Sequence, residues 1–170
     1  MAPLGITIES NTPPSPRFDP VRATRSLLRT AREGVLCTQS QALDGFPFGA
    51  PVPYLLTVDR RVALRLQATA QHALNVRTDD HVCLTVTADD ALSSSPTIES
   101  ATALGRLTRV PDDRLEEIEL GYWDRHPRRG HRGRTGHNFF WFAPVRLRYW
   151  GAHEEAFWIE ADEWFALASN

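Results

Sequence analysis

Alternating hydrophobic and polar positions run through most of the chain after its first helix and predict β-strands. Within residues 61–67, Val62, Leu64 and Leu66 fall on one face of an extended segment. Residues 81–87 show the same period of two. Further strands are predicted over residues 35–38, 50–58, 97–110, 139–142, 145–150 and 157–159.

Apolar residues spaced three to four apart predict three helices. The first begins at Asp19, whose side chain is suited to cap it, and ends before Gly34, a residue type that often closes a helix. The second covers residues 69–77 with Thr69 as its cap, and the third covers residues 111–123.

Short links between successive strands favour antiparallel pairing, because residues 58–61 and 143–144 are too few for a parallel crossover. We expect these extended segments to form six or seven mostly antiparallel strands. With helices between them, they predict a mainly β, α+β fold that forms a small closed or partly closed barrel. Gly105 indicates a bulge or a close backbone approach within its strand. We expect one domain over residues 19–170, preceded by a flexible tail at residues 1–18.

Composition narrows the classes of function. The chain is 42% hydrophobic and 24% charged, as folded globular proteins are, and its net charge of −2 favours neither nucleic acid nor an anionic membrane. No apolar run approaches the roughly 20 residues that span a bilayer. The first 16 residues lack the basic region and the long apolar region of a secretory signal, so we do not expect them to act as one. We therefore expect a cytoplasmic protein that binds no nucleic acid and no membrane. Cys37 and Cys83 are expected to be inert buried thiols.

Every basic residue is arginine, which excludes chemistry based on a Schiff-base lysine or a P-loop lysine. The chain contains no G-x-S-x-G, no H-E-x-x-H, no paired C-x-x-C and no glycine-rich dinucleotide fingerprint. The sequence therefore predicts none of the usual hydrolase, zinc or dinucleotide sites, and we expect no metal.

Residues 125–137 form the strongest cluster of positive charge. Their arginines could hold a phosphate, a haem propionate or nucleic acid, because the planar guanidinium matches such anions. The alternative is a solvated loop whose charge is neutralised by the acidic residues after residue 153.

A second candidate site lies where the helix over residues 69–77 follows a strand. Unpaired amides and the helix dipole favour an anion at such a start. The polar side chains that could hold a phosphate there are Arg65, Gln67, Thr69, Gln71 and His72. The alternative is a polar helix start whose histidine is satisfied locally.

Five segments carry a family resemblance through their order and spacing. They are R-E-G-V-L-C-T at residues 32–38, D-G-F-P-F-G-A-P-V-P-Y at 44–54, H-x-x-N at 72–75, L-G-R-L-T-R-V at 104–110 and Y-W-D-R-H-P at 122–127. Together the chain resembles the FMN-binding split-barrel superfamily, that of pyridoxamine 5′-phosphate oxidase, and within it the haem-utilisation-type branch.

The resemblance implies a split β-barrel homodimer that holds FMN between its subunits. It places the backbone of Ala50, Pro51 and Val52 against the isoalloxazine ring. It places Arg65, Leu66 and Gln67 along the ribityl chain, and Gln71 and His72 near the phosphate. Pyridoxamine phosphate oxidases use Arg and Lys around that phosphate, whereas this helix start offers neutral side chains. No catalytic acid or base is assigned.

Three hypotheses follow. The first is an FMN-dependent oxidoreductase that acts on an unidentified small molecule. The second is a haem-binding or haem-degrading protein, in which arginines of residues 125–134 hold the propionates and His126, His131 or His137 ligates the iron. The third is a non-enzymatic split-barrel module that has lost its cofactor.

Overall fold

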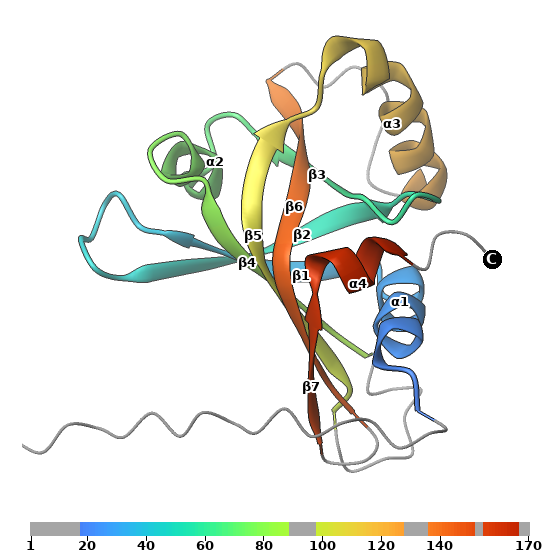
Figure 1. The fold of residues 1–170 in the computed structure, drawn as a ribbon. Coiled ribbons are helices and arrows are strands. Elements are labelled where there is room, and N and C mark those ends of the chain that lie inside the picture. Colours follow the sequence, from blue (N-terminus) through green and yellow to red (C-terminus); the bar gives the residue numbers. More distant parts are fainter. Residues whose placement is uncertain (1–17, 89–97, 128–135, 152–154, 167–170) are drawn as a thin grey trace, which may run out of the picture.

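The computed structural model describes residues 18–88, 98–127, 136–151 and 155–166 (Figure 1). The strands are β1 (Glu33–Gln39), β2 (Pro47–Leu56), β3 (Val62–Gln67), β4 (His81–Thr87), β5 (Ser100–Arg109), β6 (His137–Trp150) and β7 (Ala156–Glu160). The helices are α1 (Pro20–Thr30), α2 (Gln71–Val76), α3 (Asp112–Arg125) and α4 (Ala161–Ala166). Of the predicted tail, only Phe18 falls within the described residues.

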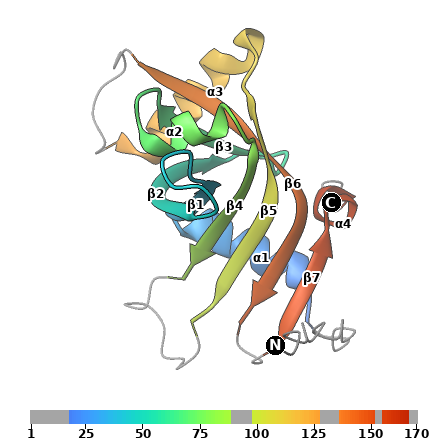
Figure 2. The ribbon, with the colours of Figure 1, turned by 90° about the vertical axis from the view of Figure 1, so that its left-hand side faces the viewer.

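Six antiparallel strands close into a barrel in the order β3-β2-β1-β4-β5-β6, and pairing between β3 and β6 completes the ring. Strand β7 extends the sheet beyond β6 (Figure 2). The predicted α+β split barrel is thereby confirmed. The predicted turn between β2 and β3 is also present, and Arg60 adopts a left-handed φ of 64° in it.

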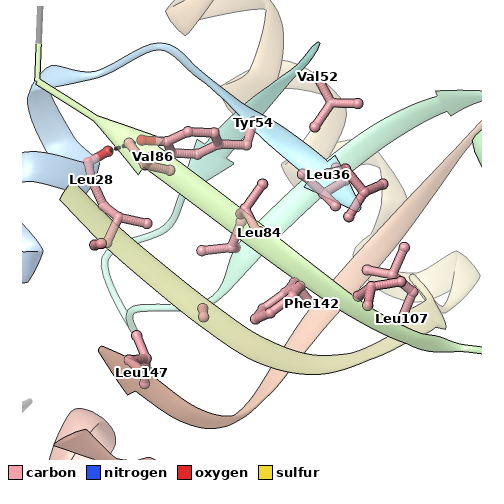
Figure 3. Packing of buried hydrophobic residues seen from close by; sticks show 14 of the residues in the cluster. Leu28, Leu36, Val52, Tyr54, Leu84, Val86, Leu107, Phe142 and Leu147 are labelled. Atoms are coloured by element: carbon pink, nitrogen blue, oxygen red, sulfur yellow. Dashed lines mark hydrogen bonds between the residues drawn. The ribbon is translucent and has the colours of Figure 1, made fainter. Parts of the chain in front are cut away.

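The barrel interior is filled by the inward-facing residues of every strand in the ring. Figure 3 shows Leu36, Leu84, Leu107 and Phe142 gathered in this space, and each is at most 4% exposed. Helix α1 packs against the same cluster through the residues Val21, Leu27 and Leu28. The Asp19 carboxylate accepts a 3.0 Å hydrogen bond from the Arg22 amide, so the predicted cap is confirmed.

Helix α3 covers the outer side of β3 and β6. A second buried cluster forms between them, made of Ala63, Val110, Ile118, Tyr122, Phe139 and Trp141. Strand β3 is therefore buried on both faces near Ala63, although its sequence alternates. Among the described residues, no helix is both long and apolar enough to cross a membrane.

The predicted hairpin over residues 139–150 is wrong, because β6 runs through it as one 14-residue strand. The register between β5 and β6 shifts at Leu104 and Gly105, and Pro144 lies opposite Gly105. A Cβ on Gly105 would collide with the Ala143 carbonyl oxygen. The Ala-Pro pair thus marks a bulge where two backbones approach closely, as Gly105 predicted.

Two predicted helix boundaries and one missing helix also need correction. Gly34 does not close α1; it lies in β1, where a Cβ would stand 2.7 Å from the Thr85 carbonyl oxygen. Helix α2 is capped at Ala70 with no side-chain hydrogen bond, so Thr69 is not its cap. Helix α4 was not predicted, because its six residues are too few to show a helical period.

Candidate functional site

Strands β2 and β3 separate soon after the turn that joins them. They pair over three positions, from Leu56 opposite Val62 to Tyr54 opposite Leu64. Beyond this point β2 pairs only with β1, and the end of β3 pairs with β6. Helix α2 contacts β1, β2 and β3 at this divergence. In Figure 1 it lies on the opposite side of the barrel from α1.

The residues predicted to hold the cofactor ring and the ribityl chain lie on the two strands that separate. Pro51 and Gln67 are exposed, and Ala50 is half-buried. Val52 and Leu66 are at most 2% exposed, because their side chains fill the barrel interior. Only the backbone of these two residues is therefore free to meet a ligand outside the barrel.

Arg65 points outward from β3 toward α3. Its guanidinium carbon lies 4.8 Å from the centroid of the Trp123 ring, a cation–π arrangement. Trp123 is half-buried and packs at the edge of the α3 cluster. The Trp123 ring therefore holds the Arg65 charge near the end of β3, two residues before Gln67, which ends the strand.

Helix α2 is fastened to β1 by a buried amide. Asn75 is fully buried and donates to the Thr38 hydroxyl at 2.9 Å. The Asn75 side-chain oxygen accepts from the Gln71 amide at 2.8 Å and from the backbone N–H of Gln41 at 3.1 Å. The Gln71 side chain is thus turned toward Asn75, although the resemblance placed it near the phosphate.

His72 lies in the first turn of α2 and is half-buried. Burial lowers the pKa of His72, so the ring is neutral at pH 7 and donates one N–H. The first amides of a helix have no intrahelical acceptor, and no side chain caps them here. Backbone N–H groups and one neutral ring N–H are therefore available at this helix start.

Sequence reasoning missed one cation near the same place. Arg77 follows α2, and its guanidinium reaches back to donate to the Ala68 carbonyl oxygen at 3.3 Å. Ala68 lies in the turn that leads into α2. A basic residue after a helix usually serves that helix's own carbonyl end, so only the shortness of α2 could have indicated this position.

Two residues of the positively charged segment 125–137 lie at the end of α3, and both make contacts that stabilise the fold. Arg125 donates to the carbonyl oxygens of Leu28, Arg29 and Ala31 at the end of α1. His126 is 4% exposed and its Nε2 lies 2.9 Å from the Tyr54 carbonyl oxygen. These contacts join α3 to α1 and β2, so neither side chain is free to bind haem. Residues 128–135 lie outside the described residues.

One group of described residues offers three possible metal-ligand atoms within 4.8 Å, namely Asp79, Asp80 and His81. His81 Nδ1 lies 2.6 Å from the Asp79 carboxylate, and Arg106 pairs with Asp80 at 3.1 Å. Hydrogen bonds from the His81 backbone and ring lower the pKa of Asp79. These partners satisfy the group at the surface, and we assign no metal to it.

Strands β1, β5 and β6 carry exposed apolar side chains that no described helix covers. Val35 is 42% exposed, Leu104 is 44% exposed, and Val145 at the β6 bulge is 61% exposed. We call these three residues the bare patch. Cys37 and Cys83 share the sheet face of Val35 and are half-buried, so the expectation that they are buried is wrong.

Comparison with known proteins gives the fold. No family model matches the sequence, and no curated protein sequence matches it. A haem-binding protein of Mycobacterium smegmatis superposes with a TM-score of 0.77 at 18% identity, covering 88% of this chain and 61% of that chain. ChuZ of Campylobacter jejuni gives 0.71 at 12% identity, covering 82% of this chain and 58% of that chain.

A third similar structure is shorter. It is a protein of the pyridoxine phosphate oxidase family from Clostridium acetobutylicum, related to general stress protein 26, with a TM-score of 0.61 at 14% identity. The match covers 87% of this chain and 100% of that chain. The chain thus has the split β-barrel fold of these proteins and spans less than two thirds of the length of the first two.

Proposed function

We propose that this chain is an FMN-dependent oxidoreductase, similar to pyridoxamine 5′-phosphate oxidase, that acts on a small molecule as a homodimer. One observation carries the proposal. The uncapped start of α2 lies where β2 and β3 separate, and the Arg77 guanidinium stands at the turn before it. Amide donors beside a cation suit a phosphate, and the separating strands leave backbone beside it.

The residues present fit FMN group by group. The phosphate would be held by the first amides of α2, by His72 and by Arg77. The ribityl chain would lie along Gln67, Arg65 and the backbone of Leu66. The backbone of Ala50, Pro51 and Val52 would face the ring. When bound, the flavin accepts and returns a hydride or electrons, and the chain's own residues supply its position and electrostatics.

The bare patch supports the proposed homodimer. Contiguous exposed apolar side chains on a soluble domain commonly mark a surface that meets another protein. Val35 and Leu104 lie on one sheet face, and Val145 is exposed at the β6 bulge, next to the residue that pairs with Leu104. A second copy of the chain could cover this area by the same face. The twofold pairing of identical surfaces is the commonest arrangement of homo-oligomers.

The phosphate assignment is tested by comparing FMN with riboflavin, which lacks the phosphate. Purified protein is titrated with each, and binding is followed by flavin fluorescence. We expect Arg77→Gln to weaken FMN about 10- to 100-fold, the effect of losing about 1.5–3 kcal/mol from a charge-assisted hydrogen bond. Riboflavin binding should stay within about twofold, because only the phosphate contact is removed.

Arg114→Gln is the matched control, because Arg114 lies on α3 and pairs with Glu117 at 2.9 Å. It should leave both affinities unchanged. Equal weakening of FMN and riboflavin by Arg77→Gln would reject the phosphate assignment. If the unmodified protein binds neither flavin at micromolar concentrations, the flavoprotein proposal fails and the cofactor-free module takes its place.

Haem binding is the second candidate, supported by the haem-binding protein among the similar structures. His126 is engaged in the fold, which leaves His72 and His137 as the half-buried histidines among the described residues. Hemin added to the protein should then give a Soret shift that His72→Ala or His137→Ala abolishes. A shift that survives both substitutions, or no shift, would reject ligation by either described histidine.

A further inference from the structure

Cys37 and Cys83 lie directly opposite each other on β1 and β4. Residues opposite in an antiparallel pair point to the same face, with Cα atoms about 4.5 or about 5.5 Å apart. Both spacings fall within the roughly 4.4–6.8 Å range that disulfides span. The chain has two cysteines, so any disulfide within one chain must join this pair.

The surroundings leave the pair open to a small reagent. Both cysteines are half-buried on the outer face of the sheet. On the other side of Cys37, the residue opposite it on β2 is Gly49, where an added Cβ would stand 3.7 Å from the Cys37 sulfur. Gly49 therefore adds no side chain over the Cys37 sulfur, and the side chain that shares this position with the sulfur is Val35.

The Cys37 thiol also acts on Cys83. Burial raises the pKa of Cys83, a hydrogen bond with the Thr85 hydroxyl lowers it, and the neighbouring Cys37 thiol raises it. The sulfur of Cys83 lies 3.7 Å from the Thr85 hydroxyl oxygen. The interaction with Cys37 requires the two sulfurs to be near neighbours, as the register indicates.

We propose that Cys37 and Cys83 are a modification site at which exchange with a small disulfide, such as oxidised glutathione, forms a reversible cross-strand disulfide. One thiolate attacks the small disulfide, forms a mixed disulfide and releases one reduced thiol. The second protein thiolate then attacks the cysteine sulfur of the mixed disulfide, which forms the cross-strand bond and releases the second small thiol. The protein loses two protons and two electrons, and the small disulfide takes them up to become two reduced thiols.

This inference stands apart from the proposed function. It needs only β1 and β4 of one chain, and its readout is the number of free thiols, with no flavin or substrate present. A second copy covering the bare patch would slow access to the sulfurs but would not change which two are opposite. The measurement is therefore made at equilibrium and not as a rate.

The experiment equilibrates the full chain in buffers of graded reduced and oxidised glutathione, quenches with a thiol alkylating reagent and measures intact mass. We expect a species that takes up no label and is about 2 Da lighter than the dithiol, with Cys37 joined to Cys83 in the peptide map. In concentrated urea, half-oxidation of the pair should need a glutathione buffer at least about tenfold more oxidising, because the fold no longer holds the two thiols together.

The matched control moves one thiol along the same strand. Cys83→Ser combined with Thr85→Cys keeps two cysteines, but position 85 pairs with Val35 and lies diagonal to Cys37. Diagonal Cα atoms are about 7–8 Å apart, beyond disulfide reach. This variant should keep two labelled thiols or form mixed disulfides when folded. The proposal is overturned if the native chain forms no intrachain disulfide in any buffer, or if the control forms it as readily.

Discussion

The outer surface of the barrel has two flanks that differ in cover. On the α3 flank, Ala63 is fully buried and Trp141 is 7% exposed, because α3 lies over β3 and β6. On the other flank, which carries the bare patch and which we call the bare flank, Val35 and Leu104 project from β1 and β5 and are 42% and 44% exposed. Both flanks present apolar side chains outward, yet the described residues supply a helix to only one of them.

The difference shows that an outward-facing apolar residue is buried only where another element of the chain packs over it. Helix α3 is amphipathic enough to bury Ile118 and Tyr122 against the sheet. The bare flank has exposed apolar area at Leu104 and half-buried thiols beside it. Exposed apolar area of this kind commonly meets another protein surface, which is why we propose the dimer contact there.

The largest expected effect sharpens this contrast through stability. Ile118→Ala should lower the free energy of unfolding by about 2–5 kcal/mol, because the 1%-exposed side chain leaves a cavity under α3. Leu104→Ala should cost less than about 1 kcal/mol in the monomer, since water already reaches that side chain. Urea unfolding at a protein concentration that keeps the chain monomeric measures both. Equal losses of unfolding free energy in the two variants would contradict this contrast between the two flanks.

The next effect tests what covers the bare flank. Leu104→Arg should weaken self-association by about a hundredfold or more, because it would bury an unpaired charge between two copies. Leu120→Arg is the matched control, since Leu120 is 45% exposed on α3. Sedimentation across a concentration series gives both dissociation constants. A wild-type chain that stays monomeric, or a control that dissociates equally, would contradict the proposed dimer face.

The smallest effect concerns the junction where α3 meets α1. The Tyr54 hydroxyl lies 2.9 Å from the Leu28 carbonyl oxygen, and Arg125 sits over its ring (Figure 3 labels Tyr54 and Leu28). Tyr54→Phe should cost about 1 kcal/mol near pH 7, the usual contribution of one hydrogen bond. Urea unfolding of the variant and of the unmodified chain at pH 7 measures the difference.

The same residue gives the stability a pH dependence. Burial raises the pKa of Tyr54, while Arg125 lowers it by less. The raised folded pKa makes this contribution complete below the unfolded value near pH 10, and it is lost as pH rises above that value. Tyr149 shifts in the same direction, mainly by burial. Tyr54→Phe should therefore flatten part of the alkaline loss, and an unchanged slope above about pH 10 would contradict the assignment.

The sequence predicted the barrel because most strands show one buried face. Val82, Leu84 and Val86 alternate with exposed or half-exposed positions, and β4 is buried in that pattern. The Asp19 cap was also predictable, because its hydrogen bond is local. The strand β6 was divided wrongly at Pro144, because a proline at a bulge and a proline in a turn look alike without the partner strand.

The candidate site was less predictable because its contacts cross between elements. The segment order suggested which strands and helix flank the divergence, and the structure brings β2, β3 and α2 together. It could not show that Gln71 turns toward Asn75 or that Arg77 reaches back to Ala68. Nor could it show that His126 is buried against β2, since that contact spans 72 residues of sequence.

The turn between β2 and β3 is secured by a residue synthesised much later. Arg60 donates to the Trp164 carbonyl oxygen at 2.7 Å, and the Trp164 indole N–H donates back to the Arg60 carbonyl oxygen at 3.1 Å. A ribosome makes Arg60 before Trp164, so the nascent β2–β3 turn lacks these two hydrogen bonds until α4 has been synthesised. A chain truncated before residue 164 would leave the Arg60 guanidinium without that carbonyl acceptor, so the β2–β3 turn depends on a contact with α4.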